Sequence, residues 1–261
     1  MGNQEKQINW LEQWKIFKDD ELFLFKDWIK PATIEDFRGK SVLECGCGGG
    51  QHTSFMAPYA ESITAVDLNT VDIAIERNAI FENVEFLEAD IATMKLNQQF
   101  DFVLCIGVIH HTDDPDQTFI NLYDHCKPGG IIIIWTYSAE GNFLVRFIVE
   151  PLRKMFLRKL PTGALVYLSK ILTLILYPFV YSIYLLPFFS FLPYFDYFNN
   201  FRRLAFKRNV LNVFDKLNAP QTKFTTINKC QEWFNVDRFK KDTININQYA
   251  GVSYTLYGVK K

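Results

Sequence analysis

The chain has 261 residues, of which 49% are hydrophobic and 22% are charged. These values are close to those of globular proteins and exclude a chain that is disordered throughout. The 28 Lys and Arg and the 29 Asp and Glu side chains give a formal net charge of −1, which excludes a basic field over the whole molecule for nucleic acid.

The first 40 residues show helical periodicity. Apolar side chains recur at intervals of three or four residues, which predicts helices packed on a core. Pro31 interrupts the pattern, so we expect the helices to end there and residues 1–40 to form a helical cap. The side chains of this apolar stripe are Trp10, Trp14, Phe17, Leu22, Phe25, Trp28 and Ile29.

Residues 41–137 alternate short apolar runs with helical stretches, residues 138–208 break this alternation, and residues 209–261 resume it. Continuous apolar strands separated by helices indicate a parallel sheet that is covered on both faces. We therefore expect one α/β domain: a doubly wound, seven-stranded, mostly parallel sheet with the helical cap and a mostly helical insertion after the fifth strand. The expected strands are Ser41–Cys45, Ser62–Val66, Val84–Glu88, Phe102–Ile106, Ile131–Tyr137, Thr243–Asn247 and Val252–Val259, and the expected helices are Gln51–Tyr59, Val71–Ile80, Pro115–Cys126 and Lys229–Phe234.

A glycine-rich turn follows the first expected strand. Gly46, Gly48 and Gly50 allow positive φ and a close approach of the backbone to a ligand. The spacing is not the GxGxxG of nicotinamide-dinucleotide sites, because Gln51 occupies the place of the third glycine. Glu44 lies two residues before the turn, and its carboxylate would repel a pyrophosphate but attract an ammonium group. The turn therefore indicates a cofactor with a positive charge.

Two more carboxylates follow the next strands. Asp67 closes the second strand, a position that typically binds a ribose diol. Asp90 follows the third strand, where it could accept a hydrogen bond from the amine of adenine. Because open α/β sheets bind ligands at the carboxyl ends of their strands, we expect both carboxylates in one site.

Five motifs in this order and spacing resemble the class I S-adenosylmethionine-dependent methyltransferases, and in particular their small-molecule branch. The resemblance covers residues 38–137 and, more loosely, residues 209–261. It implies a Rossmann-like fold, S-adenosylmethionine as the methyl donor and S-adenosylhomocysteine as the product. The motifs are Glu44-x-Gly46-x-Gly48-x-Gly50, Asp67, Asp90, Phe100-Asp101-Phe102-Val103 and Lys127-Pro128-Gly129-Gly130.

The resemblance also implies roles for single residues. Gly46, Gly48 and Gly50 would face the methionine part of the cofactor. Glu44 would bind its amino group directly or through water, and Asp67 would bind both ribose hydroxyls. The other cofactor contacts would come from Leu68 on the adenine face, from Asp90 and the Ile91 backbone at the adenine edge, and from Cys105 and Ile106 beside the sulfonium.

The segment 107–112 follows the fourth strand and resembles the loop that closes over the methyl group in the small-molecule branch. It contains His110 and His111, and either could be a general base because histidine titrates near neutrality; we rank His111 first. The alternative is that both only shape the pocket, since methyl transfer depends mainly on in-line positioning. We expect His52, in the glycine turn, to line the acceptor site. No carboxylate or cysteine spacing supports a metal site with these histidines.

Two motifs of nucleic-acid enzymes are missing after the fourth strand. There is neither an Asn-Pro-Pro-Tyr-type tetrapeptide nor a Pro-Cys pair, so we expect no DNA partner. Cys105 is expected to be a small buried residue rather than a nucleophile. The five cysteines show no CxxC spacing, which indicates no disulfide framework and a cytoplasmic location.

The insertion combines apolar length with positive charge. Ile171–Phe195 contains no charged residue in 25 positions, which is long enough for a membrane span. Pro178, Pro187 and Pro193 should divide it into pieces that are too short, and one crossing would separate the last strands from their sheet. Between Gly141 and Val210 the formal charge is +8, and the rest of the chain carries −9.

Two interpretations of the insertion stay open. It forms an apolar lid over the acceptor pocket, or it contacts an anionic membrane surface, for which apolar and basic residues together are typical. Arg202 and Arg203 are candidates for binding an anionic group of the acceptor. We expect Asn212–Pro220, which resembles a segment of the small-molecule branch, to form part of the acceptor pocket.

These features together predict a cytoplasmic methyltransferase, free or peripheral at a membrane, that acts by in-line transfer on a small-molecule or lipid-like acceptor. Two alternatives remain. The protein binds the cofactor at a membrane without turnover, or it methylates RNA with the help of the basic insertion.

Overall fold

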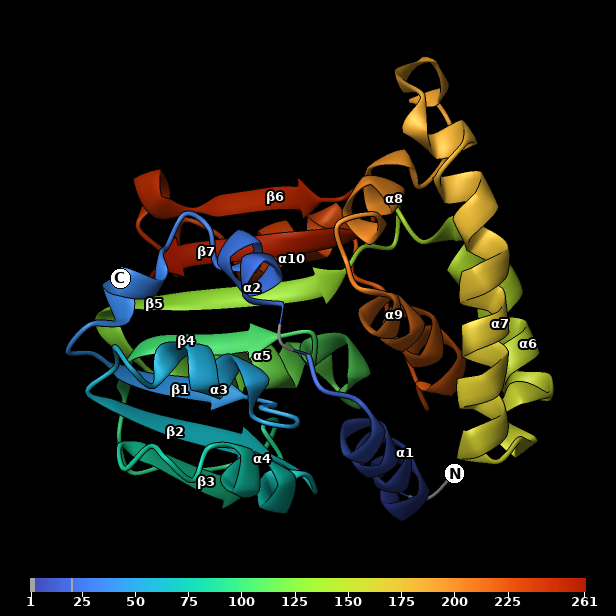
Figure 1. Ribbon diagram of the computed structural model, residues 1–261. Coiled ribbons are helices and arrows are strands. Elements are labelled where there is room, and N and C mark those ends of the chain that lie inside the picture. Colours follow the sequence, from blue (N-terminus) through green and yellow to red (C-terminus); the bar gives the residue numbers. More distant parts are fainter. Residues whose placement is uncertain (1–2, 20) are drawn as a thin grey trace.

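The computed structural model describes residues 3–19 and 21–261. Its centre is a seven-stranded sheet with the strand order β3-β2-β1-β4-β5-β7-β6 (Figure 1). The first five strands pair in parallel, and β7 is antiparallel to both of its neighbours. The strands are β1 (Ser41–Cys45), β2 (Ser62–Asp67), β3 (Val84–Glu88), β4 (Phe100–Ile106), β5 (Cys126–Tyr137), β6 (Asn245–Tyr249) and β7 (Ser253–Val259).

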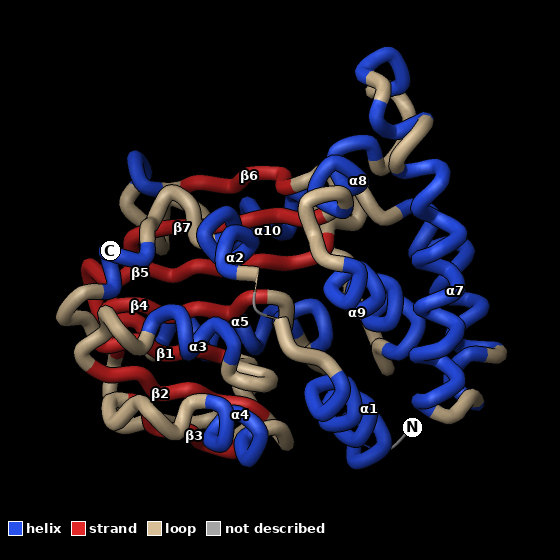
Figure 2. Tube along the Cα trace, in the orientation of Figure 1, coloured by secondary structure: helices blue, strands red, loops and turns tan. Residues whose placement is uncertain are grey.

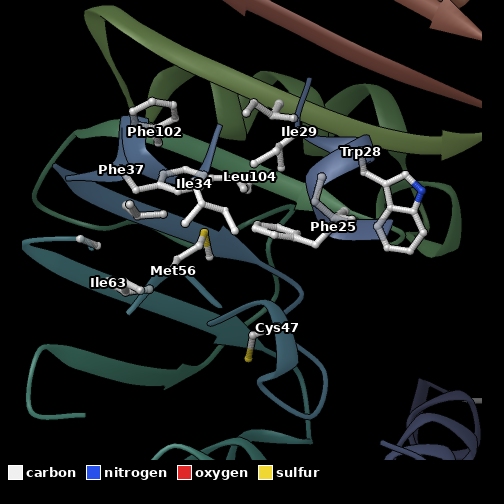
Figure 3. Packing of buried hydrophobic residues seen from close by; sticks show 14 of the residues in the cluster. Phe25, Trp28, Ile29, Ile34, Phe37, Cys47, Met56, Ile63, Phe102 and Leu104 are labelled. Carbon is white, nitrogen blue, oxygen red and sulfur yellow. The ribbon is translucent and has the colours of Figure 1, made fainter. Parts of the chain in front are cut away.

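Helices cover both faces of the sheet, and consecutive residues of β1 pack on opposite faces. Val42 belongs to a cluster that includes Phe25 and Phe37, both labelled in Figure 3. Leu43 belongs to a second cluster, on the other face, that includes Phe119. Burial on both faces explains why the strands are continuous apolar runs. The elements around the sheet are α2 (Leu22–Trp28), η1 (Ile34–Phe37), α3 (Gln51–Met56), α4 (Val71–Arg77), η2 (Ile109–His111), α5 (Pro115–Asp124), α10 (Ile227–Trp233) and η7 (Lys241–Thr243).

A helical layer lies beyond the carboxyl ends of the parallel strands (Figures 1 and 2). It joins distant parts of the sequence, because α1 comes from the N-terminal region and the other helices from the insertion and the segment after it. Phe17, Leu165 and Phe214 share one buried cluster that ties α1, α7 and α9 together. The layer contains α1 (Asn3–Ile16), the π-helical turn η3 (Val145–Val149), α6 (Glu150–Met155), η4 (Leu157–Lys159), α7 (Thr162–Val180), η5 (Ile183–Leu185), η6 (Pro187–Phe189), α8 (Phe195–Phe201) and α9 (Phe206–Asn218).

The fold class predicted from the sequence is confirmed, and the differences lie at the ends of elements. β5 begins at Cys126, five residues before the expected start. α3 ends at Met56 rather than Tyr59, and Pro58, which follows Ala57, has no N–H to continue the helical hydrogen bonds. α9 crosses the expected boundary at residue 208, so the helical layer extends to Asn218.

The prediction that prolines break the apolar stretch into short pieces is wrong for α7. This helix starts at Thr162 and continues through Pro178 to Val180, 19 residues with a mean hydropathy of 1.7. Pro178 lies in the last turn, where it removes one backbone hydrogen bond without ending the helix. Within residues 3–19 and 21–261, α7 is the one helix whose length and composition would allow a membrane span, and 22% of that stretch is buried.

Candidate active site

A cavity of about 470 Å³ lies between the sheet and the helical layer. This volume falls within the range of small-ligand sites. One wall is formed by the turns that follow the five parallel strands, and the other by side chains of α1, α8 and α9. The cavity therefore lies where open α/β sheets bind their ligands and where the sequence predicts the cofactor.

The glycine turn follows β1 and requires glycine at two points on the cavity wall. Gly46 has φ +82°, and a Cβ there would come within 2.4 Å of the Val108 side chain. Gly48 has φ +55°, and a Cβ would meet the Trp14 ring at 2.8 Å. Gly50 also has a positive φ, but it precedes α3 behind the wall and does not line the cavity. The predicted backbone approach thus applies to two of the three glycines.

The acidic and apolar residues predicted to hold adenosine line one end of the cavity. The Asp67 carboxylate accepts hydrogen bonds from the backbone of Gly48, at 2.9 Å, and of Leu68, at 2.8 Å. Asp90 accepts one from the Ala92 backbone at 2.8 Å. Asp67 Oδ1 also accepts from the Asn69 backbone at 3.4 Å, so Asp67 retains capacity for a hydroxyl at Oδ2, and Asp90 retains capacity for an amine. Leu68, Asp90 and Ile91 lie beside Asp67 on the wall.

Glu44 lies directly behind the lining of the cavity. Its side chain is buried, and Thr53 donates a hydrogen bond to Oε2, whereas Oε1 has no hydrogen-bond partner among the described residues. Burial raises the pKa of Glu44 to about 8, and burial also lowers the pKa of His52 to about 4. His52 lines the cavity with its Nδ1 3.8 Å from Glu44 Oε1. An unpartnered buried carboxylate oxygen fits a ligand with an ammonium group.

The end of β4 contributes one of its two predicted residues. Ile106 lines the cavity, whereas Cys105 is fully buried and points elsewhere. Burial raises the pKa of the Cys105 thiol to about 12, so the thiol stays protonated and unreactive. This agrees with its interpretation as a packing residue, but the structure does not support Cys105 as a cofactor contact.

The two neighbouring histidines have different environments. His110 is fully buried, does not line the cavity, and accepts at Nδ1 from the Tyr137 backbone N–H at 3.4 Å. His111 lines the cavity, and its Nδ1 lies 2.7 Å from the Gln221 carbonyl oxygen. Gln221 Nε2 in turn donates to the His111 carbonyl, and the Lys223 backbone donates to the His110 carbonyl. The fold therefore holds the His111 ring at the cavity wall and excludes His110 as a group that reaches a ligand.

Polar side chains from α9, from the end of β5 and from the segment after α1 also line the cavity. The Tyr137 hydroxyl donates to Asp215 Oδ2 at 2.9 Å, and Lys216 Nζ lies 5.8 Å from the centre of the Tyr137 ring. Arg208 Nε donates to Asp19 Oδ1 at 2.8 Å, and all five side chains line the cavity. The expected contribution of residues 212–220 is thus present. Tyr137 and Asp19 were not predicted, because nothing in their local sequence distinguishes them from packing residues.

The prediction that Arg202 and Arg203 bind the acceptor is not supported. Arg202 donates to the carbonyl oxygens of Val180, at 3.2 Å, and Tyr184, at 2.8 Å. The Arg203 guanidinium lies 4.3 Å from the centre of the Phe23 ring. Neither arginine lines the cavity: Arg202 bonds within the insertion, and Arg203 contacts the helical cap. Among the described residues, no group of three or more His, Cys, Asp or Glu side chains is arranged to hold a metal.

The aromatic cap closes the cavity from the side of α1. Trp10, Gln13 and Trp14 line it, and the Trp10 ring centre lies 4.6 Å from that of His111. Arg77 donates to the carbonyl of Trp14 at 2.6 Å, which holds the end of α1 over the glycine turn. The cap therefore contacts both the glycine turn and His111.

Comparison with known proteins identifies the core. Residues 43–134 match a family model described as a methyltransferase domain. The chain is 31% identical over 133 residues to the mitochondrial ubiquinone biosynthesis O-methyltransferase of Schizosaccharomyces pombe, which covers 49% of the chain and 48% of that protein. It is 34% identical over 117 residues to the ubiquinone biosynthesis O-methyltransferase of Rickettsia canadensis, covering 44% of the chain and 50% of the relative. The chain thus spans about half the length of these curated relatives.

A solved structure shows the same fold over most of the chain. An O-methyltransferase family protein from Burkholderia thailandensis superposes with a TM-score of 0.52 and 10% identity, over 92% of this chain and 56% of that one. Four features agree with the resemblance found in the sequence: the glycine turn, the carboxylates after β2 and β3, the strand order and the matched domain. Residues 43–134 thus match a methyltransferase domain, and the match together with the strand order supports a class I S-adenosylmethionine-dependent methyltransferase.

Proposed function

We propose that the protein transfers a methyl group to a hydroxyl group of a small acceptor with an apolar body, and that His111 is the general base. S-adenosylmethionine supplies the methyl group and leaves as S-adenosylhomocysteine, its sulfur keeping the electron pair of the broken bond. The proposal depends most on the tautomer of His111. A carbonyl oxygen only accepts, so the bond to Gln221 places the proton on Nδ1 and leaves the lone pair of the neutral ring on Nε2.

His111 would take the proton of the acceptor. As the acceptor oxygen bonds to the methyl carbon, its O–H bond breaks and the proton passes to Nε2. Burial lowers the pKa of His111, which keeps the ring neutral and able to accept a proton at neutral pH, while the Asp215 carboxylate opposes this shift and favours the charged ring after transfer. The carbonyl of Gln221 holds the ring in place throughout.

The cofactor half of the cavity would hold S-adenosylmethionine through groups already in position. Glu44 Oε1 would face the amino group, Asp67 the ribose and Asp90 the adenine. Gly46 and Gly48 would allow the methionine part to lie against the backbone. Ile106 ends β4 next to these groups and would border the methyl group.

The acceptor half favours a flat or lipid-like molecule with a hydroxyl group. Aromatic side chains form much of its wall, and polar side chains such as Asp215 and Lys216 also line it. The names of the curated relatives, ubiquinone biosynthesis O-methyltransferases, support oxygen as the accepting atom and a small molecule as the acceptor. An acceptor of this kind partitions into lipid, which supports a peripheral place at a membrane. The aromatic wall residues are Trp10, Trp28, Trp135, Tyr194, Tyr197 and Phe201.

Steady-state kinetics of His111→Gln test this proposal. The glutamine keeps a similar size but cannot take the proton, so we expect kcat to fall by about 100-fold or more, the size typical of a general base. Affinity for S-adenosylhomocysteine should stay within a factor of about two, since no cofactor contact is removed. A panel of phenols, catechols and quinols serves as acceptors. Unchanged kcat in the variant would remove His111 from the mechanism, and cofactor binding without any labelled product would favour the alternative of a protein without turnover.

A further inference from the structure

Exposed apolar side chains concentrate on the insertion. Nineteen of the twenty-eight large hydrophobic side chains that are exposed in the described residues lie between Phe143 and Phe191. Soluble monomers rarely expose contiguous apolar patches of this extent without a function. We call this surface the insertion face; its members are Phe143, Leu144, Phe147, Ile148, Leu152, Met155, Phe156, Leu160, Tyr167, Ile171, Leu174, Ile175, Phe179, Tyr181, Ile183, Leu185, Leu186, Phe188 and Phe191.

The helix α7 shows why this surface is not core. Leu165, Ser169 and Thr173 are buried at intervals of four residues, and α7 packs on α9. On the opposite side Tyr167, Ile171, Leu174 and Ile175 form a second apolar stripe that faces solvent. A surface helix of a soluble protein normally presents polar residues there. α7 therefore carries apolar side chains on both sides, and within the described residues the side away from α9 is exposed.

The tip of the insertion is the most exposed apolar part. Between α7 and α8 the chain projects beyond the body of the molecule (Figure 1). Phe188 is 79% exposed and Phe191 is 72% exposed, and their ring centres lie 6.4 Å apart. Such aromatic side chains on a protrusion can enter the boundary between headgroups and acyl chains.

The charge of the insertion is predominantly positive. Between Glu150 and Asp196 the sequence contains five basic residues and no acidic residue. Lys159 is exposed next to α6, and Lys170 lies within the outer stripe of α7. Apolar side chains with basic residues among them complement an anionic lipid surface, on which each lysine adds to the attraction.

We propose that the insertion face docks on an anionic lipid bilayer, with Phe188 and Phe191 entering the interface and Lys159 and Lys170 meeting lipid phosphates. A second copy of the chain fits less well, because a two-fold contact would place these positive charges against each other. A span by α7 would separate it from α9 and expose the buried side of both helices. The docked face leads directly into α8, whose Phe201 lines the cavity, so a membrane-dissolved acceptor would have a short path to His111.

Vesicle flotation tests the docking without reference to activity. The intact protein is mixed with vesicles of phosphatidylcholine alone or of phosphatidylcholine and phosphatidylglycerol in equal parts, at low and high salt. We expect flotation with the anionic vesicles, weakened by salt, and much less with the neutral ones. No flotation with anionic vesicles at low salt would overturn the proposal, even if cofactor binding and methyl transfer are intact.

Two pairs of variants separate the apolar and the charged contributions. Phe188→Ser with Phe191→Ser should abolish flotation, whereas Ile80→Ser with Val236→Ser, which are also exposed but lie outside the insertion, should not. Lys159→Gln with Lys170→Gln should weaken binding by about 30-fold, from a contribution of about a factor of five per lysine at an anionic surface. The control pair Lys40→Gln with Lys240→Gln should leave it unchanged.

Sedimentation velocity tests the alternative that a second copy of the chain binds the insertion face. A dimer in the absence of lipid that dissociates on Phe188→Ser with Phe191→Ser, together with no flotation, would show that the face binds a second copy. Thermal melting of every variant checks the fold. Because all four substituted positions on the insertion are exposed, we expect unchanged Tm, so a loss of flotation cannot come from unfolding.

Discussion

Glu44 should link cofactor binding to pH. The side chain is 3% exposed, its Oε1 has no hydrogen-bond partner among the described residues, and burial raises its pKa to about 8. A bound ammonium group near Oε1 would favour the ionised carboxylate. Binding of the cofactor should therefore release the proton that Glu44 holds in the free protein.

The size of the effect follows from the pKa. Below pH 8 the free protein holds Glu44 largely protonated, so binding must first remove the proton. The apparent Kd should rise about tenfold per pH unit, equivalent to about 1.4 kcal/mol, and reach a value about 100-fold weaker at pH 6 than above pH 8. Glu44→Gln removes the titrating group, so its affinity should be weaker at high pH but independent of pH.

Isothermal titration calorimetry with S-adenosylhomocysteine between pH 6 and 9 measures this directly. Two buffers with different ionisation enthalpies report the number of protons released, which should approach one below pH 7. The control is Glu85→Gln, which removes an exposed carboxylate from β3 and should behave as the unmodified protein. A flat affinity profile without proton release would refute the placement of the ammonium group beside Glu44.

Three further outcomes are expected. Asp67→Ala should weaken S-adenosylhomocysteine binding by about 100-fold or more in calorimetry, because two hydrogen bonds to a charged group are lost. The control Asp72→Ala, at an exposed position, should leave the affinity unchanged. Equal affinities of the two variants would show that Asp67 does not bind the ribose. Tyr137→Phe should lower kcat by about tenfold and leave cofactor affinity unchanged, because Asp215 loses its partner; a loss of cofactor affinity instead would place Tyr137 in the cofactor half. Because burial raises the pKa of Glu44 from 4.5 to about 8, the folded protein loses stability as the pH rises from 4.5 to about 8. Burial lowers the pKa of His52, so this residue changes the stability in the opposite direction, and mainly below pH 6.5. The free energy of unfolding without cofactor should therefore fall by about 1 kcal/mol from pH 6.5 to 8. Urea titrations that show no fall, or the same fall in Glu44→Gln, would contradict this.

The sheet and the cofactor half of the cavity could be predicted because their signals are local. The turn that contains Gly46 and Gly48 follows directly on β1, and Asp67 and Asp90 stand at the ends of neighbouring strands. Parallel pairing alone brings such residues to one edge. Gly50 shows the limit of this reasoning, since a positive φ places it at the start of α3 rather than on the wall.

The acceptor half could not be predicted to the same extent because it is assembled by contacts between distant segments. His111 reaches the cavity and His110 does not because residues 221–223 pair with their backbone. Arg202 turns to carbonyl oxygens of its own insertion, whereas Arg208, one helix further, reaches Asp19 in the cap. No spacing within the sequence encodes these choices.

The start of α7 was missed for a different reason. The uncharged stretch begins at Ile171, but the helix begins at Thr162 and includes Lys170 in its exposed stripe. A search for an unbroken apolar run excludes such a lysine. Lys170 in this stripe would be attracted to an anionic lipid surface.

Methyl transfer itself is the most direct test of the account. The purified protein is incubated with S-adenosylmethionine carrying an isotope-labelled methyl group and with a quinol or phenol that has a long apolar chain, dispersed in anionic vesicles. We predict that the label appears as an O-methyl ether in NMR spectra of the extracted product, and that His111→Gln reduces its rate of formation by about 100-fold. Label on nitrogen or carbon, or an equal rate in His111→Gln, would contradict the central claim that His111 accepts the proton of a hydroxyl acceptor.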